Sequence, residues 1–83
     1  MREEDFERAF DLYQNALDLY KEMENEREQV DILYNLAQIQ YEWGEIDLAI
    51  SALKTAIEIA TRTNYSYLDE MNSYLRKLQG ESH

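Results

Sequence analysis

The chain has 83 residues, of which 45% are hydrophobic and 31% are charged, and it contains neither proline nor cysteine. A chain of this length forms one domain near the lower size limit for a self-sufficient apolar core, and the lack of cysteine excludes disulfides and thiolate metal sites. No run of about eighteen apolar residues occurs, which excludes a membrane span. The first residues lack a secretory signal, so the cytoplasm is the default location.

The net charge of −10 is concentrated at the start of the chain. Residues 1–31 hold eleven acids and four bases, whereas residues 32–83 hold seven acids and four bases. Nucleic acids and anionic membranes are disfavoured as partners because both require clustered Lys and Arg. The charge favours a basic protein or peptide as partner, unless the acidity serves only to keep a small domain soluble.

Apolar residues at spacings of three and four predict a first helix over residues 4–24. Leu12 and Leu19 widen its apolar stripe beyond what one neighbouring helix covers. These two residues are therefore candidates for self-association. The main stripe consists of Phe6, Ala9, Phe10, Tyr13, Ala16, Leu17, Tyr20 and Met23.

A turn and a second helix, over residues 26–43, are predicted next. Apolar residues are absent from 24 to 29, and Asn25 followed by Glu28 is typical of a capping box. Gly44 suits a left-handed cap at the end of this helix. One unbroken helix from 4 to 43 is the alternative, but its stripe would have little to pack against.

The remaining apolar residues predict a third helix over residues 46–62 and a fourth over residues 66–79. Ser66 is the expected cap of the fourth helix, and Gly80 is its expected stop. The fourth helix has a single narrow stripe, which is typical of a terminal, capping helix. This stripe consists of Leu68, Met71, Leu75 and Leu78.

The chain contains an internal repeat with an offset of 40 residues. Residues 6–13 match residues 46–53 without a gap, and the match continues over residues 16–19. A fixed period of this size indicates stacked helical units, each burying its apolar face against the next. The aligned alanines are Ala9 with Ala49 and Ala16 with Ala56.

The spacing within residues 33–61 is similar to that of a known repeat. It reads Leu33-x2-Leu36-Ala37-x2-Gln40, then x8-Ala49-x3-Leu53-x2-Ala56-x4-Thr61. This resembles the tetratricopeptide repeat, W-x2-L-G-x2-Y then A-x3-F-x2-A-x4-P, in an elongated form, since the family's usual period is about 34 residues. The departures are Leu33 for Trp, Ala37 for Gly, Gln40 for Tyr and Thr61 for Pro, and the last weakens the helix stop.

The resemblance implies a single all-α domain over residues 1–83, an antiparallel helical-repeat stack of four helices with a right-handed twist. Residues 9–16 match the second half of a preceding unit, and residues 65–79 the start of a following one. The first helix of each pair then lines a concave groove that binds a segment of a partner protein.

On this chain the helix at 26–43 would line the groove. Asn35 resembles the family's groove asparagine, whose amide can both donate hydrogen bonds to a ligand backbone and accept them from it. The alternative is that Tyr34 and Tyr41 pack against the fourth helix and fill the groove. The expected partner-binding residues share one side of the helix: Asp31, Tyr34, Asn35, Gln38, Tyr41 and Glu42.

The sequence offers no basis for catalysis, a cofactor or a metal site. The only histidine is His83, at the end of the sequence, and no glycine-rich phosphate loop is present. The leading hypothesis is therefore a non-enzymatic adaptor for protein partners. Two alternatives stay open: a homodimer formed through the first helix, and a piece of a longer repeat array.

Overall fold

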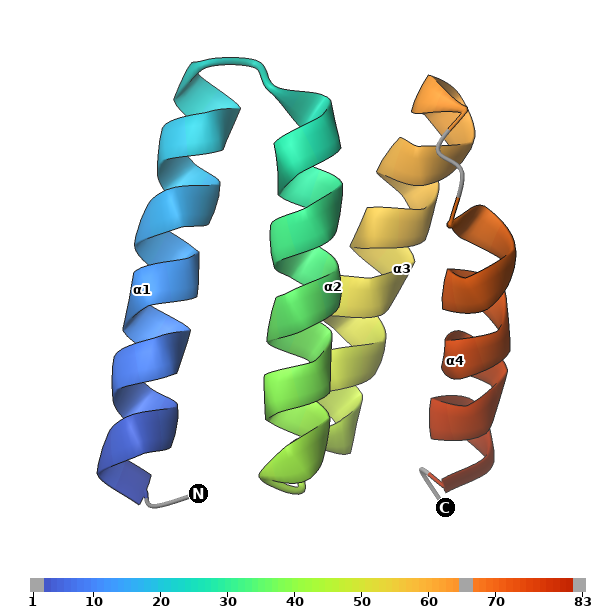
Figure 1. Cartoon of the computed structure of the whole chain (residues 1–83). Coiled ribbons are helices and arrows are strands. Elements are labelled where there is room, and N and C mark those ends of the chain that lie inside the picture. Colours follow the sequence, from blue (N-terminus) through green and yellow to red (C-terminus); the bar gives the residue numbers. More distant parts are fainter. Residues whose placement is uncertain (1–2, 65–66, 82–83) are drawn as a thin grey trace.

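The computed structural model describes residues 3–64 and 67–81, and within them every regular element is an α-helix. The helices run alternately up and down, and Figure 1 shows α1 and α4 at opposite ends of the row. This confirms the expected all-α, antiparallel repeat stack. The helices are α1 (Glu3–Glu22), α2 (Glu26–Glu42), α3 (Ile46–Thr63) and α4 (Leu68–Glu81).

The turn between α1 and α2 excludes the alternative of one unbroken helix. Glu24 adopts a left-handed conformation with φ of 56°, and the N–H of Asn25 donates to the carbonyl of Tyr20 at 2.9 Å. The helix therefore ends at Glu22, earlier than the expected residue 24. The Asn25 side chain accepts a hydrogen bond from the backbone N–H of Glu28 at 3.2 Å, which confirms the cap. Only this half of the capping box forms, because the Asn25 N–H is already bound to α1.

The ends of the other helices differ from expectation by one or two residues. Gly44 has φ of +78° and closes α2 as expected, although the last helical residue is Glu42 rather than 43. Asn64, with φ of 57°, caps α3 in the left-handed conformation. The predicted stop at Gly80 is wrong, since α4 includes this glycine. The predicted cap Ser66 lies outside the described residues.

The apolar core follows α3, which packs against both α2 and α4, whereas α1 packs chiefly against α2. Leu53 is fully buried, and burying an aliphatic side chain of this size contributes about 1.5–3 kcal/mol. Among the residues whose burial is described, α1 contributes only Leu17 to the buried set, and α4 only Met71 and Leu78. The two central helices therefore supply most of the core.

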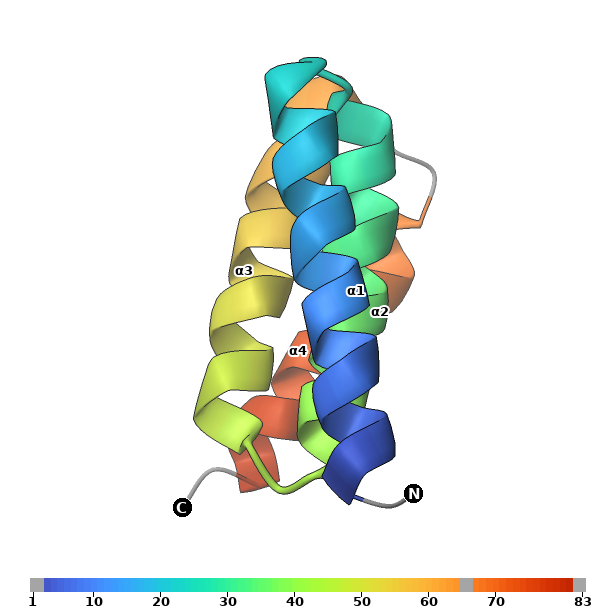
Figure 2. The ribbon, with the colours of Figure 1, turned by 90° about the vertical axis from the view of Figure 1, so that its left-hand side faces the viewer.

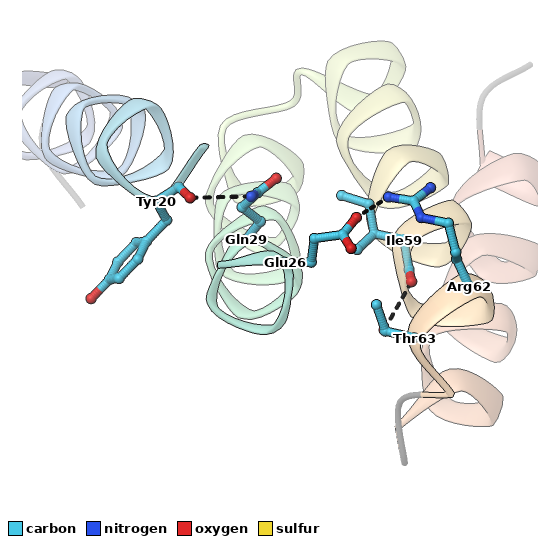
Figure 3. Close-up of polar contacts among 6 residues, drawn as sticks. All are labelled: Tyr20, Glu26, Gln29, Ile59, Arg62 and Thr63. Atoms are coloured by element: carbon cyan, nitrogen blue, oxygen red, sulfur yellow. Dashed lines mark hydrogen bonds and ion pairs between the residues drawn. The ribbon is translucent and has the colours of Figure 1, made fainter. Parts of the chain in front are cut away.

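Polar contacts connect three helices at one end of the stack (Figure 3). The Gln29 side-chain amide is buried and donates to the carbonyl of Tyr20 at 3.3 Å, which links α2 to α1. Arg62 forms an ion pair with Glu26, which links α3 to α2. Because both charged groups are well exposed, this pair contributes only about 0–1 kcal/mol. The Thr63 hydroxyl donates to the carbonyl of Ile59 at 2.9 Å and satisfies the last turn of α3.

No helix in the described part of the chain combines the length and the hydrophobicity that crossing a bilayer requires.

Candidate functional site

Three tyrosine rings form a cluster between α2 and α4. Tyr34 and Tyr41 lie one heptad apart on α2, and Tyr74 of α4 contacts both edge-on. The ring centroids of Tyr34 and Tyr74 are 5.9 Å apart, and those of Tyr41 and Tyr74 are 6.1 Å apart. Edge-to-face pairs at these distances are favourable because the positive edge of one ring meets the negative face of the next. The cluster fixes the orientation of all three side chains.

Polar contacts at the end of α4 complete this tyrosine cluster. The hydroxyl of Tyr41 donates to a carboxylate oxygen of Glu81 at 2.9 Å, and the Lys77 ammonium lies 5.2 Å from the Tyr41 ring centroid. The hydrogen bond to Glu81 raises the pKa of Tyr41 because it favours the protonated phenol. Burial is the first cause that raises the pKa of Tyr74 to about 12, followed by the nearby ionisable groups of Tyr41, Tyr34, Glu42 and Glu81. Both phenols are therefore neutral hydrogen-bond donors at physiological pH.

The predicted partner-binding residues divide into two groups in the structure. Tyr34 and Tyr41 are half-buried because they pack against Tyr74, so the contact with the fourth helix that the alternative describes is present. Asp31 is also half-buried. The remaining three, Asn35, Gln38 and Glu42, are exposed on the outer side of α2. The structure thus places a polar, solvent-facing strip beside a fixed aromatic cluster, and partner binding there stays a prediction.

A second candidate surface is an apolar strip on the outer side of α1, the helix nearest the viewer in Figure 2. Leu12 is 64% exposed and Leu19 is 53% exposed. Met23, which the sequence places in the same stripe as buried residues, is 59% exposed. Its exposure is consistent with the early end of α1, since Met23 lies in the turn after Glu22.

A shallow pocket of about 300 Å³ lies between α1 and the start of α3. Phe6, Phe10 and Leu48 supply its apolar lining, and Phe6 also stacks on Trp43 with a centroid distance of 4.8 Å. Such a site suits the aliphatic stem and charged end of a lysine or arginine. Periodicity within single helices does not reveal it because its lining comes from two helices. Its acidic residues are Glu7, Asp11 and Glu45.

Among the described residues, no group of three or more His, Cys, Asp or Glu side chains is placed to hold a metal ion. The geometry instead consists of stacked antiparallel helices with a half-buried aromatic cluster and exposed apolar and polar surfaces. This defines a helical-repeat protein.

Comparison with known families identifies the repeat. The tetratricopeptide repeat matches residues 1–62, which include α1, α2 and all of α3 except its last residue, and the chain belongs to this family. Proteins of this family typically act as non-enzymatic modules that mediate protein–protein interaction. Comparison with curated proteins and with solved structures gave no match.

Proposed function

We propose that this chain binds a segment of a partner protein along the exposed side of α2, next to the tyrosine cluster. The observation that carries the proposal is the combination of fixed rings and exposed amides. Because Tyr34 and Tyr41 already pack against Tyr74, these tyrosines lose little side-chain entropy when a ligand packs on them. Asn35 and Gln38 each offer a donor and an acceptor to an extended backbone.

The partner is proposed to be basic. The chain carries a net charge of −10, and Asp31 and Glu42 flank the exposed amides on α2. Like-charge repulsion disfavours an acidic segment or a terminal carboxylate at this surface, while complementary charge accelerates the association of a basic one. The proposed role is that of a non-enzymatic adaptor, and it requires no cofactor.

Peptide selection tests this proposal without a known partner. Peptides selected from a random displayed library on the wild-type protein should be enriched in Lys and Arg. Asn35→Ala should weaken their binding by about tenfold, the effect of losing one or two hydrogen bonds, without lowering the melting temperature. Glu58→Ala is the matched control, because Glu58 is exposed on α3, away from this surface.

A second variant separates the chemistry of the tyrosine cluster from its packing. Tyr41→Ala would remove the contacts with Tyr74 and Lys77 and so affect stability as well as binding. Tyr41→Phe keeps the ring and removes only the hydroxyl that donates to Glu81. If peptide binding is unchanged by Asn35→Ala and by Gln38→Ala, the exposed side of α2 is not the binding surface.

Self-association is a second candidate function, favoured by the exposure of Leu12 and Leu19. A neighbouring unit in a longer repeat array would cover the same residues. The oligomeric state of the chain in solution distinguishes self-association from this alternative.

A further inference from the structure

The internal repeat makes α3 a reference for the packing of α1, because each residue of α1 has a counterpart 40 positions later. Leu19 corresponds to Ile59, which is only 8% exposed, whereas Leu19 itself is 53% exposed. Ala16 corresponds to Ala56, which is fully buried, whereas Ala16 is partly exposed. The difference arises because α3 lies between two helices and α1 has one close neighbour. The outer side of α1 therefore resembles a surface that normally packs against a second helix, but no helix covers it in the described structure.

This surface, here named the α1 seam, has a regular heptad pattern. Small and large side chains alternate along it at spacings of three and four, which is typical of a helix that packs closely against another. In an antiparallel pair of α1 helices, Ala9 of one copy lies opposite Leu19 of the other, and Ala16 lies opposite Leu12. Each of the two leucines thus meets an alanine. The seam consists of Ala9, Leu12, Ala16, Leu19 and Met23.

The charges beside the seam are self-complementary in this antiparallel arrangement. Arg8, Asn15 and Glu22 follow one another at heptad spacing along one edge of the seam, and all three are exposed. An antiparallel pair places Arg8 of each copy next to Glu22 of the other, and the two Asn15 side chains next to each other. The opposed helix dipoles also favour this direction. The pattern matches a second copy of the same helix, because reversing the helix exchanges its positive and negative ends.

The opposite end of the stack does not offer a surface for continued growth. The outward side of α4 carries Asp69, Ser73 and Arg76, all exposed, and Arg76 donates to the Ser73 hydroxyl at 3.3 Å. A polar face of this kind is typical of a capping helix in a repeat stack. Head-to-tail filaments would require an apolar face at both ends, so association through the α1 seam closes at two copies.

We propose that two copies of this chain form a twofold-symmetric dimer through the antiparallel pairing of their α1 seams. One helix per copy supplies a small interface, which corresponds to a transient dimer with a dissociation constant in the micromolar range. The net charge of −10 on each copy opposes association at long range. Added salt screens this repulsion and strengthens the dimer. This dimer is independent of peptide binding at α2, which lies on another side of the molecule.

Sedimentation velocity from low to high micromolar protein tests the dimer directly. The wild-type protein should shift from monomer to dimer, and Leu19→Glu should remain a monomer with an unchanged melting temperature. Leu48→Glu is the matched control, because Leu48 is 51% exposed on α3 and lies off the seam, and it should dimerise like the wild type. A wild-type protein that stays monomeric at high micromolar concentration overturns the proposal, and so does a control that loses dimerisation equally.

Charge reversal tests the direction of the pairing. Arg8→Glu places two like-charge pairs across the dimer and should weaken it by about tenfold, whereas the double variant Arg8→Glu with Glu22→Arg should restore it. Only a second copy carries the compensating change, so rescue supports self-association over a different partner. If the double variant is as weak as the single one, the antiparallel pairing is wrong.

Cross-linking locates the symmetry axis, since the chain contains no cysteine of its own. Asn15→Cys should be linked into a covalent dimer by a short bismaleimide. Thr55→Cys is the control, because Thr55 is the exposed counterpart of Asn15 in α3 and should give little product. Equal cross-linking of both variants would contradict the proposal. Loss of peptide binding in Asn35→Ala with retained dimerisation would show that the two surfaces are separate.

Discussion

Ala56 and Ala16 occupy equivalent positions in the internal repeat but different environments. The same change to leucine, made separately at each position, therefore compares the packing around α3 with that around α1. Ala56 is fully buried in the core, whereas Ala16 is partly exposed beside the open side of α1. Leucine at position 56 requires space that the neighbouring helices occupy, and overpacking of this kind costs about 1–3 kcal/mol. Ala16 packs against the core but is also partly exposed, so leucine at position 16 has more room and should lower the free energy of unfolding by less than leucine at position 56 does.

The size of the effect relative to total stability makes it easy to measure. A chain of this length has a free energy of unfolding of roughly 4–12 kcal/mol, so Ala56→Leu removes a large part of it. The melting temperature should fall by about 4–24 °C, given roughly 4–8 °C for each kcal/mol in a small domain. Urea titration at low micromolar protein, followed by circular dichroism, keeps dimerisation out of the comparison. Equal destabilisation by Ala16→Leu would refute the inference that α1 has an open side.

Three further predictions concern single contacts. Asn25→Ala removes the only side-chain cap observed at the start of α2 and should lower the free energy of unfolding by about 1 kcal/mol in urea titration. Gln40→Met should raise the free energy of unfolding by about 1 kcal/mol, because the Gln40 side-chain oxygen is buried without a hydrogen-bond partner. An unchanged midpoint of the urea titration would contradict this. Tyr74 has its pKa raised from 10.0 to about 12, so its neutral form contributes stability below pH 10 that is lost as the pH rises towards 12. Tyr74→Phe should therefore show a weaker loss of stability over this range, measured by thermal melts.

The sequence predicts the bounds of α2 well because several independent signals agree on them. Asn25 caps its start, Gly44 supplies the positive φ after its end, and the apolar residues between them keep helical spacing. The end of α3 is likewise predicted to within one residue, but the error is in the other direction. Thr61 stands where the repeat pattern has proline, and without proline the helix continues to Thr63.

The end of α4 shows why a glycine alone is a weak stop signal. Gly80 costs the helix only about 1 kcal/mol relative to alanine, and it does not occupy a left-handed conformation here. Leu78 is fully buried just before it, and Glu81 accepts a hydrogen bond from Tyr41 just after it. These tertiary contacts hold the last turn together. They involve residues some forty positions apart, which local patterns cannot reveal.

The tyrosine cluster is only partly predictable from the sequence. Tyr34 and Tyr41 are identified from their heptad spacing on one helix. Tyr74 is missed because it lies outside the apolar stripe of α4, and its role depends on how closely α4 approaches α2. The exposure of Leu12 and Leu19 is predicted from the sequence, because the first helix resembles the second half of a repeat unit without its first half.

The distribution of charge gives the two proposed surfaces opposite responses to salt. Residues 1–31 carry eleven acids and four bases, and they include all of α1 and the start of α2. This charge attracts a basic peptide and repels a second copy of the chain, and both effects weaken once the screening length falls below about 10 Å, near 0.1 M salt. Added salt should therefore slow peptide association and strengthen the dimer, while the short-range contacts of the α1 seam persist. Peptide binding and dimerisation should therefore be measured across the same salt series. If added salt weakens the dimer as well as peptide binding, the dimer is governed by attraction between opposite charges and not by apolar packing of α1.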